Sequence, residues 1–267
     1  MLVSIRHATR YSYDAATSFA VHRLRLTPFD NRAQKVRRWA IEAEGMEGAA
    51  LYIDGFGNRV HLVTHCKPYE ALTITAAGEV ETEDCGGIVG DLGEAANPLV
   101  FLRATPRTES SPAIDALADG LANHRALDRM HRLLEAIAAH VVYDTDATHQ
   151  GTTAAEAFAA GQGVCQDHAH IFIAAARRLR TPARYVTGYL VMQGTEHAVA
   201  HHAWAEAFVP DLGWIGFDPA NHVCPTEHYV RLACGFDAAS AAPITGTRRG
   251  GGAESLAVDV MVRQQQQ

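Results

Sequence analysis

The spacing of apolar residues changes twice along this chain of 267 residues, from strand-like to helical and back to strand-like. Near the N-terminus the side chains alternate with a period of two, as in Leu24 and Leu26 against Arg23 and Arg25. Residues 128–141 instead carry an apolar stripe at helical spacing. After residue 183 the chain returns to short runs rich in β-branched and aromatic residues. This order predicts an α+β fold.

The first part of the chain predicts a small all-β domain. Alternating runs at 21–26, 60–64 and 72–76 indicate strands, and Asp54-Gly55-Phe56-Gly57-Asn58 supplies the residues of a tight reversal. We expect an antiparallel sandwich or barrel. A glycine-containing acidic stretch over 82–96 indicates the boundary, which divides the chain into domains 1–85 and 86–267. An alternating run at 255–262 predicts a last strand, returning to a sheet, within the second domain.

The second domain begins with helices and ends with strands. After Pro112 the apolar spacing becomes helical, and Thr153 with Glu156 has the spacing of a capping box. Strands are predicted over 183–192, 203–209 and 214–217, the last two joined by a turn over 210–213. This order, a helix and then antiparallel strands, again indicates an α+β domain.

Composition and charge exclude several classes of partner. The net charge is −7 and the 23 basic residues are scattered, so we expect no nucleic-acid partner. No apolar run is long enough to span a membrane, and charge stands where a signal peptide would be apolar, so we expect neither a membrane partner nor secretion. Five cysteines without a CxxC pair argue against a disulfide framework and predict a cytoplasmic location.

Cys165 has surroundings that suit a reactive thiol. It follows the glycine-flanked segment Gly161-Gln162-Gly163-Val164 and opens an alanine-rich helical pattern. Glycines allow a sharp turn and a close approach of substrate, and a helix N-terminus presents free N–H groups to an anion such as a thiolate. A lone cysteine is more often a small buried apolar residue, so the assignment depends on what accompanies it.

A histidine and an aspartate downstream complete the residue types that thiol catalysis requires. His202 opens one predicted strand and Asp218 closes the next, so a hairpin would bring them together at one sheet edge. A base can hold the thiolate as an ion pair, and a carboxylate can fix the tautomer of the base. The chain has 15 histidines, and an Asp before proline is a common turn residue, so these residues alone leave a chance association open.

Four segments in this order resemble the transglutaminase-like superfamily, and within it the bacterial transglutaminase-like cysteine peptidases. They are Gly163-Val164-Cys165-Gln166-Asp167 with Ala169-His170, Pro182-Ala183-Arg184-Tyr185-Val186-Thr187-Gly188-Tyr189, His202-Ala203-Trp204, and Gly213-Trp214 with Gly216-Phe217-Asp218-Pro219. The first 80 residues are similar to the β-rich N-terminal domain of the same family, in Tyr11-Ser12-Tyr13, Arg23-Leu24, and Asp54 with Gly57-Asn58. The resemblance covers nearly the whole chain.

The resemblance implies a role for each of the three residues. Cys165 is the expected nucleophile, His202 the general base and acid, and Asp218 the orienting carboxylate. The implied fold is a papain-like, transglutaminase-like core in which the Cys helix packs on an antiparallel sheet carrying His and Asp. The expected reaction is acyl transfer on a peptide, protein or small amide through a thioester, without a cofactor. Hydrolysis is favoured because water is always present, and transfer to an amine is the alternative.

Two other classes of function stay open from the sequence. One is a zinc enzyme, since Cys165, His168, His170, His197, His201 and His202 are potential ligands, although no HExxH or paired CxxC accompanies them. The other is a non-catalytic binding or scaffold module with the same fold, which the presence of all three catalytic residue types disfavours.

Three positions depart from the family pattern. The family commonly has an aromatic residue where His168 stands, Thr where Ala220 stands and Arg where Phe236 stands. None of these is one of the three expected catalytic residues, so we expect the three departures to affect which substrate is preferred. For His168, one helical turn after Cys165, a structural role is favoured over one near the pocket.

Overall fold

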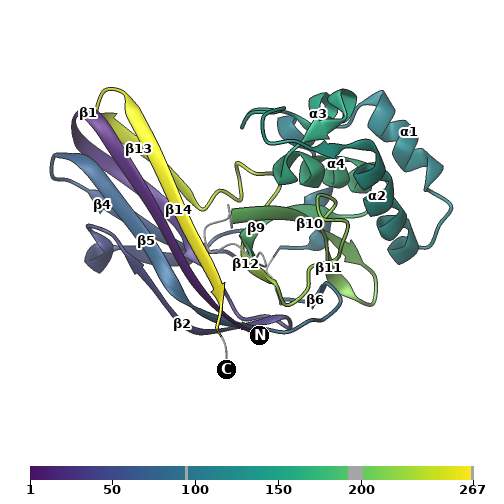
Figure 1. The fold of residues 1–267 in the computed structure, drawn as a ribbon, viewed down its shortest axis with the longest axis horizontal. Coiled ribbons are helices and arrows are strands. Elements are labelled where there is room, and N and C mark those ends of the chain that lie inside the picture. The colour runs from purple at the N-terminus through teal and green to yellow at the C-terminus, as the bar shows by residue number, and fades with distance from the viewer. Residues whose placement is uncertain (94–95, 192–200, 266–267) are drawn as a thin grey trace.

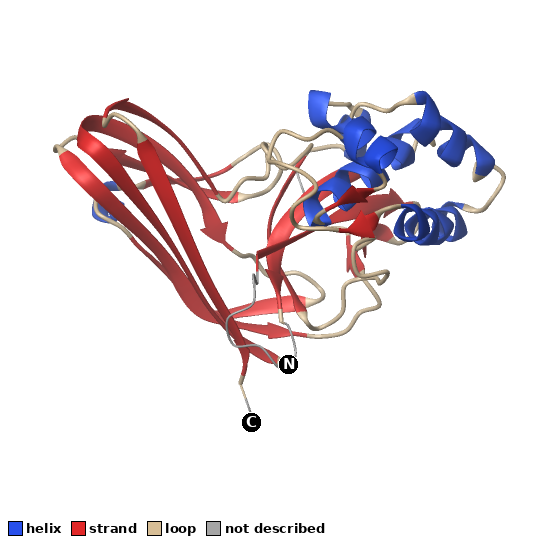
Figure 2. Ribbon diagram, turned by 45° about the horizontal axis from the view of Figure 1, so that its top comes forward, coloured by secondary structure: helices blue, strands red, loops and turns tan. Residues whose placement is uncertain are grey.

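The computed structural model describes residues 1–93, 96–191 and 201–265 and contains two antiparallel β-sheets, one of which is covered by helices (Figures 1 and 2). The predicted α+β class is confirmed. No helix among the described residues is long and apolar enough to cross a membrane.

The first sheet has seven strands, drawn on the left of Figure 1. They are β1 (Leu2–Thr27), β2 (Gln34–Glu42), β3 (Ala50–Ile53), β4 (Arg59–His65), β5 (Tyr69–Thr82), β13 (Ile244–Gly250) and β14 (Glu254–Gln264). The long strand β1 lies at the centre. β5 and then β4 run antiparallel along it, as do β14 and then β13, while β2 pairs with β5 and β3 with β4.

β1 bends sharply, so that its two halves face one another. The ring centroids of Tyr11 and His22 lie 5.7 Å apart, although eleven residues of straight strand would span about 36 Å. The register with β5 shifts between Ser12 and Thr17, and the three glycines at the end of β13, residues 250–252, have positive φ angles. Such irregularities bend a strand pair. Residues of both halves, among them Val3 and Leu24, share one hydrophobic cluster, which agrees with the predicted sandwich.

The C-terminal strands belong to this first sheet. The strand predicted over 255–262 lies within β14 and pairs with β1. The prediction from the sequence assigned this strand to the second domain. Short strand β6 (Ile88–Gly90) already pairs with β11 of the second sheet. The boundary after residue 85 itself stays a prediction.

The second sheet has five strands in the order β12-β9-β10-β11-β6. Its further strands are β9 (Ala183–Leu190), β10 (His201–Val209), β11 (Gly213–Phe217) and β12 (Tyr229–Gly235). Strands β10 and β11 form the predicted hairpin, whose turn contains Asp211 and Gly213 at positive φ.

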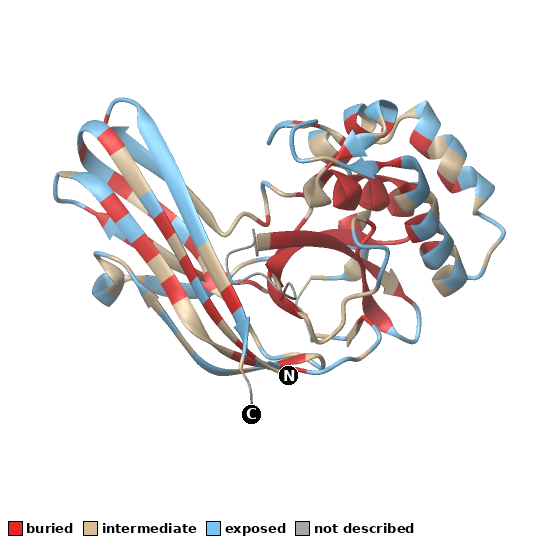
Figure 3. Cartoon of the chain, in the orientation of Figure 1, coloured by how far each residue is buried: buried red, intermediate tan, exposed pale blue. Residues whose placement is uncertain are grey.

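The described residues form four α-helices, of which two contact the second sheet directly and the other two pack on the last helix. They are α1 (Pro112–Gly120), α2 (Ala126–His140), α3 (Ala154–Ala160) and α4 (Cys165–Arg178). The capping box of Thr153 and Glu156 opens α3 as predicted, and Gly161 ends it at φ 67°. α4 is almost wholly buried and packs on β10, where Ala203, Ala205 and Ala207 allow a close approach (Figure 3).

The two sheets are packed together. Tyr189 of β9 and Val230 of β12 belong to the same hydrophobic cluster as Val3 of β1. The side chain of Asn58 also accepts a hydrogen bond from the Cys234 N–H and donates one to the Cys234 carbonyl, each at 2.8 Å. The second sheet therefore has the helices on one part of its surface and the sandwich on another.

Candidate active site

Cys165 is the first residue of α4 and is partly exposed. Asp167 fixes the turn before it, since its buried Oδ2 accepts hydrogen bonds from the Val164 N–H (2.9 Å) and the Thr148 hydroxyl (2.7 Å). A Cβ on Gly163 would lie 2.8 Å from both Cβ and Oδ2 of Asp167, so glycine is required there. The first N–H groups of a helix have no intrahelical acceptor, and in α4 these groups lie at the end that carries Cys165.

His202 and Asp218 are brought together by the β10–β11 hairpin. His202 Nε2 donates to Asp218 Oδ2 at 2.6 Å, and both side chains are buried. The carboxylate has further donors, because the Tyr229 hydroxyl (2.7 Å) and Asn221 Nδ2 (2.8 Å) also bond to Oδ2. The pKa of Asp218 is lowered, since these hydrogen bonds outweigh the effect of burial, which acts to raise it.

The thiol of Cys165 reaches the imidazole of His202. Burial acts to lower the pKa of His202, but hydrogen bonds to Asp218 and Cys165, together with their charges, raise it to about 10. Because Asp218 engages Nε2, Nδ1 is the ring nitrogen left for the thiol. The structure thus brings Cys165, His202 and Asp218 into one connected group, in which His202 is an imidazolium at neutral pH.

Three residues that the sequence did not single out also belong to this site. Tyr229 and Asn221 bond to Asp218, and Tyr143 of β7 (Val142–Tyr143) lies close to the thiol. The pKa of Tyr143 is raised by burial and by the charges of Cys165 and Asp218. β7 pairs with β8 (Gln162–Gly163) directly before α4, which places Tyr143 there. Asn221 follows Asp218 by three residues and could have been found from that spacing, whereas Tyr229 comes from another strand.

The other predicted zinc ligands have separate partners. Both ring nitrogens of His168 face backbone carbonyls, those of Val164 (2.9 Å) and Val141 (3.1 Å), which ties the start of α4 to the end of α2. His170 Nε2 accepts from the Ala238 N–H, and His201 bonds to Thr187. Among the described residues, no three His, Cys, Asp or Glu side chains are grouped to hold a metal ion. His197 lies outside the described residues.

The other departures from the family pattern lie around the site without altering it. The Ala220 N–H donates to Asp218 Oδ1 at 3.1 Å, a bond that any residue at this position can make. Phe236 packs edge-on against Phe56 with ring centroids 4.9 Å apart, and Arg103 lies over its ring. Position 236, where the family commonly has Arg, is therefore part of an aromatic contact in this protein.

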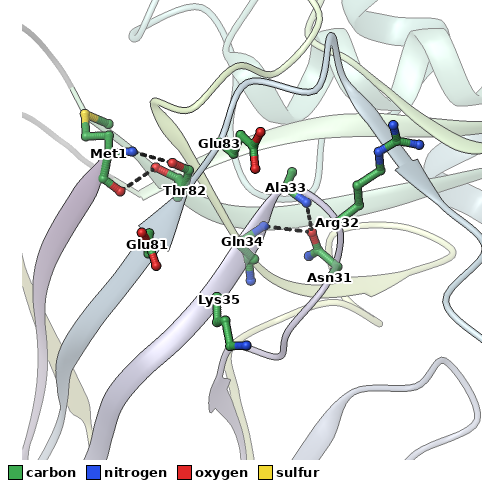
Figure 4. A pocket seen from close by; sticks show the side chains of 9 residues that line it. All are labelled: Met1, Asn31, Arg32, Ala33, Gln34, Lys35, Glu81, Thr82 and Glu83. Carbon is green, nitrogen blue, oxygen red and sulfur yellow. Dashed lines mark hydrogen bonds between the residues drawn. The ribbon is translucent and has the colours of Figure 1, made fainter.

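A cavity of about 440 Å³ lies away from this group (Figure 4). It is lined by residues of both charges, including Arg32 and Glu83, between the ends of β2 and β5. None of the three residues of the connected group lines it, so it has no part in their chemistry.

Comparison with known proteins agrees with the geometry. Residues 115–219 match the transglutaminase-like superfamily. Residues 3–81 match the bacterial transglutaminase-like N-terminal region, and the two matches together span more than half of the chain. The chain belongs to the transglutaminase-like superfamily. Its superfamily core includes both Cys165 and Asp218, and the sandwich corresponds to the N-terminal region.

Relatives of this superfamily member extend over its full length. An uncharacterized protein of Mycobacterium leprae is 29% identical over 270 residues, which cover 96% of each chain. An uncharacterized protein of Mycobacterium tuberculosis is 26% identical over 271 residues, covering 91% of this chain and 86% of that one. A solved structure from Cytophaga hutchinsonii, named a putative cysteine protease, superposes with a TM-score of 0.76 at 21% identity, covering 98% of this chain and 90% of that chain. This last likeness shows the fold.

Proposed function

We propose that this protein hydrolyses amide or peptide bonds through a thioester on Cys165. The observation that carries the proposal is the connected group at the start of α4, in which His202 joins Cys165 to Asp218. Membership of the transglutaminase-like superfamily supports an enzyme of this class. The same arrangement favours catalysis over a scaffold role, because a buried imidazolium held between a thiol and a carboxylate has no evident structural purpose.

The chemistry follows from the positions of the three side chains. The Cys165 sulfur attacks the carbonyl carbon, and N–H groups at the start of α4 stabilise the oxyanion, where loss of one donor costs about 3 kcal/mol. His202 donates its proton to the leaving amine as the C–N bond breaks, which leaves a thioester. Water then gives a proton to His202 and attacks the thioester, the S–C bond breaks, and the acid is released. No step requires a cofactor.

Transfer to an amine differs only in the second step, where an amine replaces water at the thioester. We propose hydrolysis first, because water is always available at the partly exposed thiol. Profiling the products with and without an added primary amine distinguishes the two, since a transferase forms the new amide and a hydrolase forms the acid. A peptide, protein or small amide is the proposed substrate. With all five cysteines free, we propose a cytoplasmic location.

Alkylation by iodoacetamide tests the proposed site directly. Peptide mapping by mass spectrometry compares Cys165 with exposed Cys66 in the same molecule. Because the His202 imidazolium stabilises a thiolate, we expect Cys165 to react about tenfold faster than Cys66 at pH 6, and His202→Ala to abolish the difference. Equal rates in the wild type, or a rate that rises only above about pH 8, contradict the proposal. Activity that survives alkylation but not a chelator would favour the zinc alternative.

A further inference from the structure

One face of β10 contacts both the helical cluster and the sandwich. Ala203 and Ala205 of β10 pack against the helical cluster, to which the partly buried Cys165 also belongs. Two residues before Ala203 on the same face, His201 contacts His7 of β1, with ring centroids 5.9 Å apart. The stretch of β10 around His201 therefore connects the part of the sheet that carries α4 with the sandwich.

A pocket lies beside this stretch of β10, between the two halves of the sandwich. It has a volume of about 350 Å³, enough for a large side chain. Its walls are mainly apolar and are formed by Ile244 of β13 and by Leu256 and Val258 of β14. His7 and His201 form its polar end, and His201 immediately precedes His202 in the chain. We call it the interlayer pocket.

The interlayer pocket is uncharged. No Asp, Glu, Lys or Arg lines it among the described residues. Burial lowers the pKa of both His7 and His201 to about 4, assisted by neighbouring histidine charges, so both are neutral at pH 7. Both nitrogens of His7 are engaged, with the Tyr189 hydroxyl (3.0 Å) and Thr9 (3.2 Å), and His201 Nε2 bonds to Thr187 (2.9 Å). A charged group placed there would lose its hydration without gaining a partner.

The wall of the interlayer pocket is open to solvent although it is apolar. Leu256 is 56% exposed and Val258 is 53% exposed. Among the described residues, the part of β14 that carries Leu256 and Val258 pairs with β1 alone, so the outer edge of this part can bond to an extended chain. Exposed apolar residues beside a free strand edge are typical of a surface that binds a peptide.

We propose that the interlayer pocket, which is lined by the residue that directly precedes His202, holds an uncharged apolar side chain of a peptide substrate of Cys165. This inference rests on the proposed function and adds the substrate class: peptides with a bulky aliphatic or aromatic residue near the bond that is attacked. The N-terminal sandwich then takes part in substrate selection, because three of its strands line the pocket.

Two alkylating reagents test the pocket separately from the thiol. One is iodoacetamide, and the other is the same reagent carrying a phenylethyl group on its amide nitrogen. For each reagent, the labelling rate at Cys165 is divided by the rate at Cys66. We expect this ratio to be about tenfold higher for the phenylethyl reagent than for iodoacetamide. Leu256→Glu places a charge in the pocket and should reduce this preference to about one, with the iodoacetamide rate unchanged. The matched control is Leu51→Glu, since Leu51 is 61% exposed on β3, and it should retain the preference.

A preference for the phenylethyl reagent that survives Leu256→Glu, or that is absent from the wild type, overturns the proposed role of the pocket. The iodoacetamide rate still reports on the reactivity of the Cys165 thiol in either case. If Cys165 proves unreactive, the proposed function fails, and equilibrium binding still tests the pocket. N-acetylphenylalanine methylamide should then bind the wild type in NMR titrations at least about tenfold more tightly than it binds Leu256→Glu. Equal binding to the two proteins overturns the inference.

Discussion

His202 is the residue on which the geometry of the site depends. Its pKa in the folded protein, about 10, lies above the ordinary value of 6.5. A raised pKa contributes stability that is fully present below about pH 6.5 and is lost as the pH rises towards 10. We therefore predict that the melting temperature of the wild type falls over this interval more steeply than that of His202→Gln. Thermal unfolding at pH 6, 8 and 10 measures the melting temperature of both proteins. An equal dependence of the two melting temperatures on pH would argue against the raised pKa of His202.

Tyr229 is a positioning residue in this account, because it bonds to Asp218 and need not touch the substrate. Tyr229→Phe keeps the edge-on contact with Trp204 but removes one donor from the carboxylate. The pKa of Asp218 should then rise, which moves the acidic limb of the pH–kcat profile to higher pH and lowers kcat by roughly 3- to 10-fold. Tyr52→Phe on β3 is the control. An unmoved acidic limb would show that Tyr229 has no part in holding Asp218.

Gly163 is a third residue on which the geometry at Cys165 depends. A methyl group there collides with Asp167, which holds the turn before Cys165. Gly163→Ala should slow alkylation of Cys165 by about tenfold or more, because the start of α4 must shift relative to His202. Gly55→Ala is the control, since nothing lies within 4 Å of a Cβ placed on Gly55. Unchanged alkylation of Gly163→Ala would show that the turn tolerates the shift.

At the scale of the elements, a buried ionic group joins three strands of the second sheet. Glu206 of β10 bonds to Arg184 of β9 at 2.6 Å and to Arg231 of β12 at 2.7 Å. Burial acts to raise the pKa of Glu206, but the two arginines lower it to about 2. Its contribution to stability is therefore present above about pH 4.5 and is lost as the pH falls towards 2.

Removing this carboxylate leaves two buried cations close together. Glu206→Ala should lower the free energy of unfolding by about 3–5 kcal/mol, as measured by urea denaturation at pH 7. Exposed Glu47→Ala should change it by less than about 0.5 kcal/mol. A loss of the same small size for both variants would contradict the structural role of the ionic group.

The elements that could be predicted are those with local signals. The glycine-flanked turn into α4, the capping box of α3 and the turn of the β10–β11 hairpin are each contained within a few residues. β1 was recognised only over 21–26, because its bend and its pairing with β14 involve residues more than 200 positions away. The role of Tyr229 was missed because no local pattern links it to Asp218, which lies eleven residues earlier in the chain and on a different element.

At the scale of the whole molecule, a transglutaminase-like core is joined to an N-terminal sandwich that C-terminal strands complete. Strand β1 pairs with residues from both ends of the sequence, so the sandwich forms only when the whole chain is present. We predict that deletion of residues 244–265 exposes the sandwich core and lowers the melting temperature, since the cluster loses Val262. Differential scanning calorimetry measures the change, and an unaltered transition would contradict it.

The central claim is that the acyl group of the substrate passes through Cys165. Rapid acid quenching followed by mass spectrometry, with an activated acyl ester as substrate, tests this most directly. We predict one acyl group attached to Cys165 in the wild type, no such group in Cys165→Ala, and much slower formation in His202→Ala. Turnover without an adduct on Cys165 would contradict this claim. So would a kinetically competent adduct on any other residue.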